Sequence, residues 1–282
     1  MRLAFRISLL AIGLASWFAA AASAGALVEF ANLSERDPAT LFGYLARPDQ
    51  GLSALLGSGA HGPEQYPAVV VLHGCSGLSS HTTEIVDRLG SWGYVALAVD
   101  SLGARGLANR CTSLSLDQAF DAYAALRYLA QQEFVDPTRI AVLGQSMGGY
   151  STLYAVDRDM VAQYFAERFR AAVAYYPACG VVPLPTFAVP VLILIGEADD
   201  WTPADRCREM IAHARPDSTP ITLHVYPNAK HAFDVAVLKP GRRVFGHSVE
   251  YNELAAQDAE EKTRAFLAAH LAEISPATGN TR

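Results

Sequence analysis

Short apolar runs alternate with amphipathic stretches along most of this chain. The runs are rich in Val, Ile, Leu and Ala, a pattern typical of strands buried on both faces of a parallel sheet. They lie at residues 68–72, 94–99, 139–143, 171–176, 191–195 and 222–226. Helical spacing between the runs predicts helices near 80–90, 116–130, 203–213 and 258–270, and one more directly after residue 146. This alternation predicts an α/β fold with a mostly parallel sheet covered by helices on both faces.

The connections between these elements are mostly short. Residues 26–30 and 41–46 read as early strands that pair antiparallel, and residues 48–67 are rich in Gly, Ser and Pro, as in a surface loop. The connection at residues 157–170 is too short for a large lid domain, so we expect an open site. The long connection at 237–250 is either a wall of the pocket or a solvated excursion.

The stretch Gly144-Gln145-Ser146-Met147-Gly148 matches G-x-S-x-G and lies between a predicted strand and a predicted helix. In that context the serine occupies a sharp turn that exposes its hydroxyl, and glycines two positions away leave room for the turn. The sequence therefore predicts Ser146 as a nucleophile. The backbone N–H of Met147, at the start of a helix, would stabilise developing negative charge.

A serine nucleophile needs a base and an acid that orients the base, in the chain order Ser, Asp or Glu, His. Asp199 follows the strand 191–195, and His231 follows the strand 222–226. We therefore predict Asp199 as the orienting acid and His231 as the general base and acid. Asp200 is the rival to Asp199, and its alternative reading is a solvated loop carboxylate. The other late histidines lie away from strand ends; they are His213, His224, His247 and His270.

A second oxyanion donor is expected from the loop after strand 68–72, which reads His73-Gly74-Cys75-Ser76-Gly77. The backbone N–H of Cys75 is the predicted donor, because Gly74 allows the chain to approach the reacting carbonyl closely. His73 could be a metal ligand or a base, but we favour a structural histidine that orders the loop.

The N-terminus has the features of a secretory signal peptide. Arg2 and Arg6 give a basic start, residues 9–22 are apolar, and Ala22-Ser23-Ala24 is an A-x-A cleavage site. We expect residues 1–24 to be removed, leaving a periplasmic or secreted protein whose residues 25–282 form one catalytic domain without a membrane anchor. The alternative is an uncleaved anchor.

The 282 residues carry a formal charge of −6 and no basic cluster, which argues against nucleic acid as a partner. In an exported protein the four cysteines predict two disulfides. The strands preceding them favour the pairs Cys75–Cys111 and Cys179–Cys207. Metal binding is the alternative, but the sequence has no CxxC motif or histidine cluster, and no metal is predicted.

Several motifs together resemble the dienelactone hydrolase family of α/β-hydrolases over roughly residues 40–270. They are Val71-Leu-His-Gly-Cys-Ser-Gly77, Asp100-Ser-Leu-Gly-Ala-Arg-Gly106, Val135-Asp-Pro-Thr-Arg-Ile140, Gly144-Gln-Ser-Met-Gly-Gly149, Gly196-Glu-Ala-Asp-Asp-Trp-Thr-Pro203 and His231-Ala-Phe233. The resemblance implies an eight-stranded α/β-hydrolase fold and hydrolysis of small esters or lactones without a cofactor. It places the family's nucleophile, acid and histidine at Ser146, Asp199 and His231.

The chain departs from the founding enzymes of that family at three points. Ser146 stands where they have a cysteine, and Gly74 stands where they have a glutamate that contacts it. Of their two substrate-binding arginines, one could be matched by Arg105, but Val235 stands near the other. Arg105 is thus either a carboxylate-binding residue or a surface arginine. Trp201 either lines the pocket or packs beneath the Cys179–Cys207 bridge.

These features favour an exported serine esterase acting on small soluble esters or lactones through an acyl-enzyme. A cutinase-like polyesterase is an alternative enzyme, since G-x-S-M-G-G also occurs there. A non-catalytic binding protein on a hydrolase fold is the alternative outside enzymes, although such a role needs none of Ser146, Asp199 and His231.

Overall fold

A computed structural model of the chain describes residues 25–33, 38–48, 65–181 and 184–273. The predicted signal segment, residues 1–24, and most of the predicted surface loop at 48–67 lie outside the described residues.

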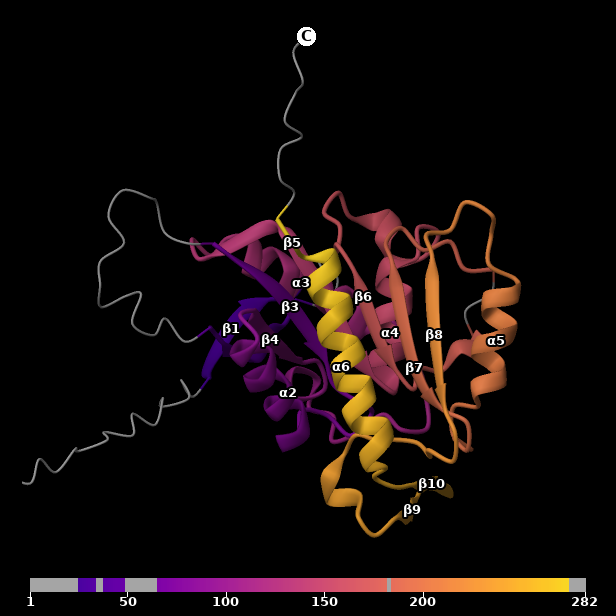
Figure 1. Cartoon of the computed structure of the whole chain (residues 1–282). Helices are drawn as coiled ribbons and strands as arrows, with labels where there is room; N and C mark the ends of the chain where they lie inside the picture. Colours follow the sequence, from indigo (N-terminus) through magenta and orange to yellow (C-terminus); the bar gives the residue numbers. More distant parts are fainter. Residues whose placement is uncertain (1–24, 34–37, 49–64, 182–183, 274–282) are drawn as a thin grey trace, which may run out of the picture.

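One eight-stranded sheet organises the molecule (Figure 1), in the order β1-β2-β4-β3-β5-β6-β7-β8. The strands are β1 (Ala26–Ala31), β2 (Thr40–Ala46), β3 (Tyr66–Leu72), β4 (Val95–Asp100), β5 (Val135–Gln145), β6 (Ala172–Tyr175), β7 (Val191–Gly196) and β8 (Ile221–Tyr226). β2 pairs antiparallel with β1 and with β4, and the remaining pairs are parallel. The predicted α/β class and mostly parallel sheet are confirmed.

Helices cover both faces of the sheet. They are α2 (Ser80–Ser91), α3 (Asp117–Ala130), α4 (Met147–Val156), α5 (Ala204–Ala212) and α6 (Glu253–His270). In Figure 1, α2 and α6 lie on the near side of the sheet, while α3 and α4 lie on the far side. Between α4 and β6 the structure places only a single 3₁₀ turn, Val161–Tyr164, so the described part of the chain has no separate lid domain.

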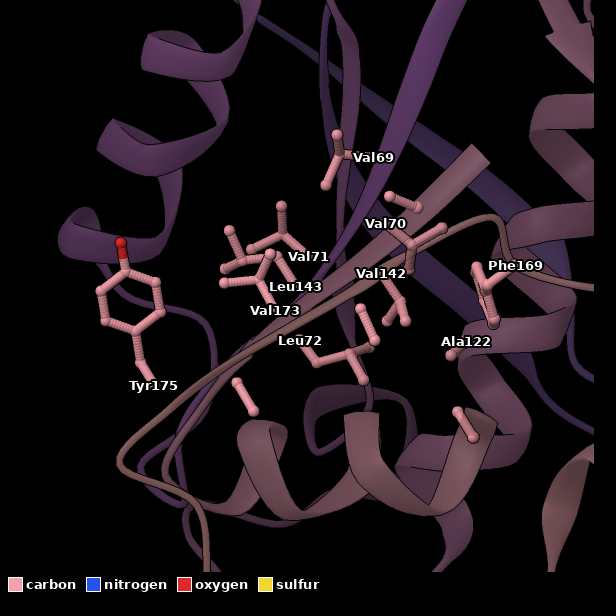
Figure 2. Packing of buried hydrophobic residues seen from close by; sticks show 14 of the residues in the cluster. Val69, Val70, Val71, Leu72, Ala122, Val142, Leu143, Phe169, Val173 and Tyr175 are labelled. Atoms are coloured by element: carbon pink, nitrogen blue, oxygen red, sulfur yellow. The ribbon is translucent and has the colours of Figure 1, made fainter. Parts of the chain in front are cut away.

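The central strands are buried on both faces, which explains their near-continuous apolar sequences. In Figure 2, Val71, Leu143 and Val173 gather on one side of the sheet, and Val70 and Val142 lie on the other with Phe169. Because successive residues of a strand point to opposite faces, each strand supplies side chains to both halves of the core. This double packing fixes the strand ends from which the site loops emerge.

Two elements differ from the expectations. β5 begins at Val135 rather than near residue 139, because its pairing with β3 resumes after an irregularity that holds Pro137. The connection at 237–250 contains a hairpin of β9 (Arg242–Val244) and β10 (His247–Val249), which the sequence pattern did not predict.

Candidate active site

Ser146 occupies the turn between β5 and α4 with φ 53° and ψ −113°, a backbone conformation that residues other than glycine rarely adopt. A Cβ atom on Gly144 would lie 2.1 Å from the carbonyl oxygen of Gly148, and one on Gly148 would lie 2.1 Å from that of Leu72. Both positions therefore require glycine if the turn is to close. The N–H of Ser146 donates to the carbonyl of Tyr175 at 2.9 Å, which ties the strained residue to the end of β6.

The three residues predicted as nucleophile, base and acid meet at the carboxyl edge of the sheet. Ser146 Oγ lies 2.9 Å from His231 Nε2, and His231 Nδ1 lies 2.7 Å from Asp199 Oδ2. His231 and Asp199 are buried, at 3% and 4% exposure, so little water competes for these contacts. The arrangement allows a proton to move from the serine hydroxyl to an imidazole whose other nitrogen faces a carboxylate.

Asp199 is held by the turn that follows it. Its Oδ1 accepts hydrogen bonds from the N–H groups of Trp201 (2.9 Å) and Thr202 (2.8 Å), and Thr202 Oγ1 lies 2.9 Å from Oδ2. Thr202 is a site residue that the sequence reasoning missed. An Asp with Thr three positions later is a recognisable local signal for such a side-chain-to-backbone turn.

Asp200 points elsewhere. Its Oδ1 accepts from the N–H of Ser248 at 2.9 Å, and its carbonyl oxygen lies 3.0 Å from His247 Nδ1. Burial would raise the pKa of Asp200, but hydrogen bonds from Ser248 and the nearby His247 and Arg243 hold that pKa below its usual range. Asp200 thus fastens the β9–β10 hairpin to the loop that carries Asp199.

The loop after β3 brings Cys75 to the same edge. Cys75 is joined to Cys111, and its carbonyl accepts from the N–H of Arg110 at 2.8 Å. His73 is fully buried, with Nδ1 2.7 Å from the carbonyl oxygen of Gly74 and Nε2 accepting from the N–H of Ser101 at 3.2 Å. Burial lowers the pKa of His73. These contacts fit the expected structural histidine that orders the loop.

Two cavities, each of about 280 Å³, flank Ser146, and both are also lined by Cys75 and Trp201. The first is bordered by His231 and has an apolar wall. That wall is made of Val235, Val237, Leu238, Val244 and Val249. The second is bordered by Met147, Arg110 and the segment 112–114. The connection at 237–250 is therefore a pocket wall, one of the two alternatives the sequence left open.

Arg105 forms an ion pair inside the protein. Its guanidinium donates two hydrogen bonds to Asp121, at 2.7 and 3.0 Å, and one to the carbonyl of Ser101 at 2.7 Å. Burial raises the pKa of Asp121, and the Arg105 charge opposes that rise. Arg105 is not among the residues lining either cavity beside Ser146. The guanidinium of Arg105 therefore faces a buried carboxylate of the protein itself.

Trp201 lines both cavities. Its ring stacks on His247 with centroids 4.9 Å apart and lies 5.0 Å from the ring of His231. The second disulfide, Cys179–Cys207, is buried and joins a 3₁₀ turn to α5. Trp201 thus lines the pocket, which is one of the two alternatives that the sequence left open. Among the described residues no helix has the length and apolar character to span a membrane.

Comparison with known proteins gives one consistent result. The model of the family described as "Dienelactone hydrolase family" matches residues 52–271 of this chain. A Bradyrhizobium protein named "Probable 2-oxo-3-(5-oxofuran-2-ylidene)propanoate lactonase" is 25% identical over 219 residues, covering 73% of this chain and 84% of its own. Cutinase est1 of Thermobifida alba is 27% identical over 176 residues, covering 59% and 53%. The solved structure of a dienelactone hydrolase-like promiscuous phosphotriesterase from metagenomic libraries superposes with a TM-score of 0.65 at 20% identity, covering 88% of this chain and 100% of that one.

Proposed function

The chain belongs to the dienelactone hydrolase family and is a hydrolase of esters or lactones, and from this premise we propose that it works as an exported serine esterase. The proposal rests on one observation above all. A continuous chain of short contacts runs from Ser146 Oγ through His231 to Asp199. Export is proposed from the two disulfides, which form and persist in oxidising compartments, together with the N-terminal sequence.

In the proposed reaction, Ser146 Oγ attacks the carbonyl carbon of the ester while His231 Nε2 takes the hydroxyl proton. The N–H groups of Cys75 and Met147 stabilise the oxyanion of the tetrahedral intermediate. Its collapse breaks the bond to the alcohol oxygen, which receives the proton from His231. Water then attacks the acyl-enzyme as His231 takes its proton, and the acid leaves as Ser146 regains a proton. Asp199 keeps the imidazole oriented and stabilises its charged form throughout.

The two cavities suggest which part of the substrate lies where. The leaving oxygen must lie next to His231, which protonates it, and His231 borders the cavity with the valine-rich wall. We therefore assign the alcohol part of the ester to that cavity. The acyl part then extends over Met147 toward the segment 112–114. Because an apolar wall favours apolar groups, esters of apolar alcohols are the expected substrates.

A polyesterase is the second enzyme candidate, favoured by the relative named cutinase and by the open cleft. Turnover of p-nitrophenyl acetate by the wild type and by Ser146→Ala tests the proposal. We expect the variant to lose at least about 10³-fold in kcat. A wild-type protein that binds esters without turning them over would favour the non-catalytic alternative instead. Release of soluble products from an aliphatic polyester film would favour the polyesterase.

A further inference from the structure

A second polar cluster lies behind the nucleophile, centred on the carboxylate of Asp234. Tyr176 Oη donates to Asp234 Oδ1 at 2.6 Å, and His81 Nε2 lies 3.1 Å from Oδ2. The side-chain amide of Gln145 contacts both partners, 3.0 Å from Asp234 Oδ2 and 2.7 Å from His81 Nε2. The side chains of His81 and Asp234 are only 15% and 12% exposed. No step of the proposed reaction uses this cluster.

Each of its members belongs to a different segment of the proposed site. Gln145 directly precedes Ser146, and Asp234 follows His231 by three residues. His81 lies in the first turn of α2, which follows the loop that carries Cys75.

Tyr176 connects the cluster to a fourth segment, the one that carries Asp199. Its carbonyl oxygen lies 3.1 Å from Thr202 Oγ1, beside Asp199, and its ring meets that of His231 edge-on at 4.8 Å. Its φ of 36° is a strained value that the surrounding contacts must maintain. Asp234 thus links the segments that carry the nucleophile, the base, the acid and an oxyanion donor.

The cluster is also balanced in charge. Burial would lower the pKa of His81, but the Asp234 carboxylate raises it above its ordinary value, helped by Glu84 and opposed by Arg88. Burial would raise the pKa of Asp234, but His81 holds it down. Arg88 is itself paired with Glu260 of α6 at 2.9 Å. An ion pair of His81 and Asp234 therefore leaves little net charge behind the site.

We propose that the His81–Asp234 pair is a positioning element that aligns the site segments and keeps the Asp234 charge from acting on His231. The inference rests on the proposed function, since it concerns the base of that reaction. Neutralising His81 alone exposes His231 to an uncompensated carboxylate. An uncompensated carboxylate favours the charged form of a neighbouring imidazole. Neutralising Asp234 as well removes that carboxylate charge.

The test is the pH profile of kcat/KM for ester hydrolysis, and in particular the pH at which activity falls on its acid limb. It is measured for His81→Gln, Asp234→Asn and the double variant. We expect the limb of His81→Gln to move up by about half a pH unit, the size of effect that one charge produces across partly buried protein. The double variant should have its acid limb at the same pH as Asp234→Asn. His81→Lys keeps the positive charge and should keep the wild-type limb. Asp87→Asn, which removes an exposed charge of the same helix that faces Tyr44 and not the cluster, is the matched control and should not move it.

The outcomes separate the two levels of the proposal. An unmoved limb in His81→Gln, or a shift that persists in the double variant, overturns the inference. If His81→Gln does not fold, His81→Lys decides instead, because an upward shift in that variant contradicts charge compensation. Ester turnover that survives Ser146→Ala overturns the proposed function, whatever the limb does.

Discussion

Removing the Cys75–Cys111 disulfide should lower both the stability and the rate of this protein. The bridge joins residues 36 positions apart, so the chain-entropy account gives about 4 kcal/mol of stabilisation. A loss of that size corresponds to a fall in Tm of roughly 8–16 °C for a domain of this length. The double variant Cys75→Ala/Cys111→Ala, followed by calorimetry, measures the stability loss.

The same change should slow catalysis, because Cys75 carries a proposed oxyanion donor. Losing such a donor outright lowers kcat by about 10²–10³-fold. Here the donor remains on a loosened loop, still tied through Arg110, so we expect a fall of about tenfold. Initial rates on p-nitrophenyl acetate, taken well below the Tm of the variant, isolate this effect from unfolding.

The second bridge supplies the matched control. Cys179–Cys207 closes a separation of 28 residues, which also gives about 4 kcal/mol, but neither cysteine lines the cavity bordered by His231. Cys179→Ala/Cys207→Ala should therefore destabilise to a similar extent and leave kcat within about twofold. Equal kcat in the two double variants would refute the claim that the first bridge positions an oxyanion donor.

Three further changes test other parts of the site. Asp199→Asn should lower kcat by about 10⁴-fold, and Asp200→Asn by less than tenfold; steady-state kinetics showing the reverse would exchange their roles. Arg105→Leu strands the buried charge of Asp121 and should lower the free energy of unfolding by about 3–5 kcal/mol in urea titrations, while kcat stays within about tenfold. Val244→Phe narrows the proposed alcohol cavity and should lower kcat/KM for benzyl acetate about tenfold, but not for ethyl esters of longer acids. A loss confined to longer acids would reverse the assignment of the two cavities.

The sheet and the nucleophile turn were predictable because their signals are local. Buried strands need unbroken apolar runs, and the turn at Ser146 needs glycine at positions 144 and 148 for steric reasons that hold in any chain. The positions of Asp199 and His231 followed from chain order, since parallel strands present their carboxyl ends at one edge of the sheet.

The side-chain partners could not be predicted in the same way. The ion pair between His81 and Asp234 joins residues 153 positions apart, and no local sequence pattern near either residue predicts it. Arg105 lies in a glycine-rich loop that suggests exposure, yet its charge is taken up by a carboxylate of α3. The short β9–β10 hairpin has too few apolar positions to show a strand period, although its packing makes the pocket wall.

Covalent trapping of the nucleophile tests the central claim most directly. The full chain, exported and with its disulfides intact, is treated with a fluorophosphonate, and peptide mapping by mass spectrometry locates the adduct. We expect a single adduct on Ser146. The fraction of protein labelled should equal the fraction of ester turnover lost, and Ser146→Ala should carry no adduct. An adduct on another residue, or equal labelling of Ser146→Ala, would contradict the assignment of Ser146 as the nucleophile.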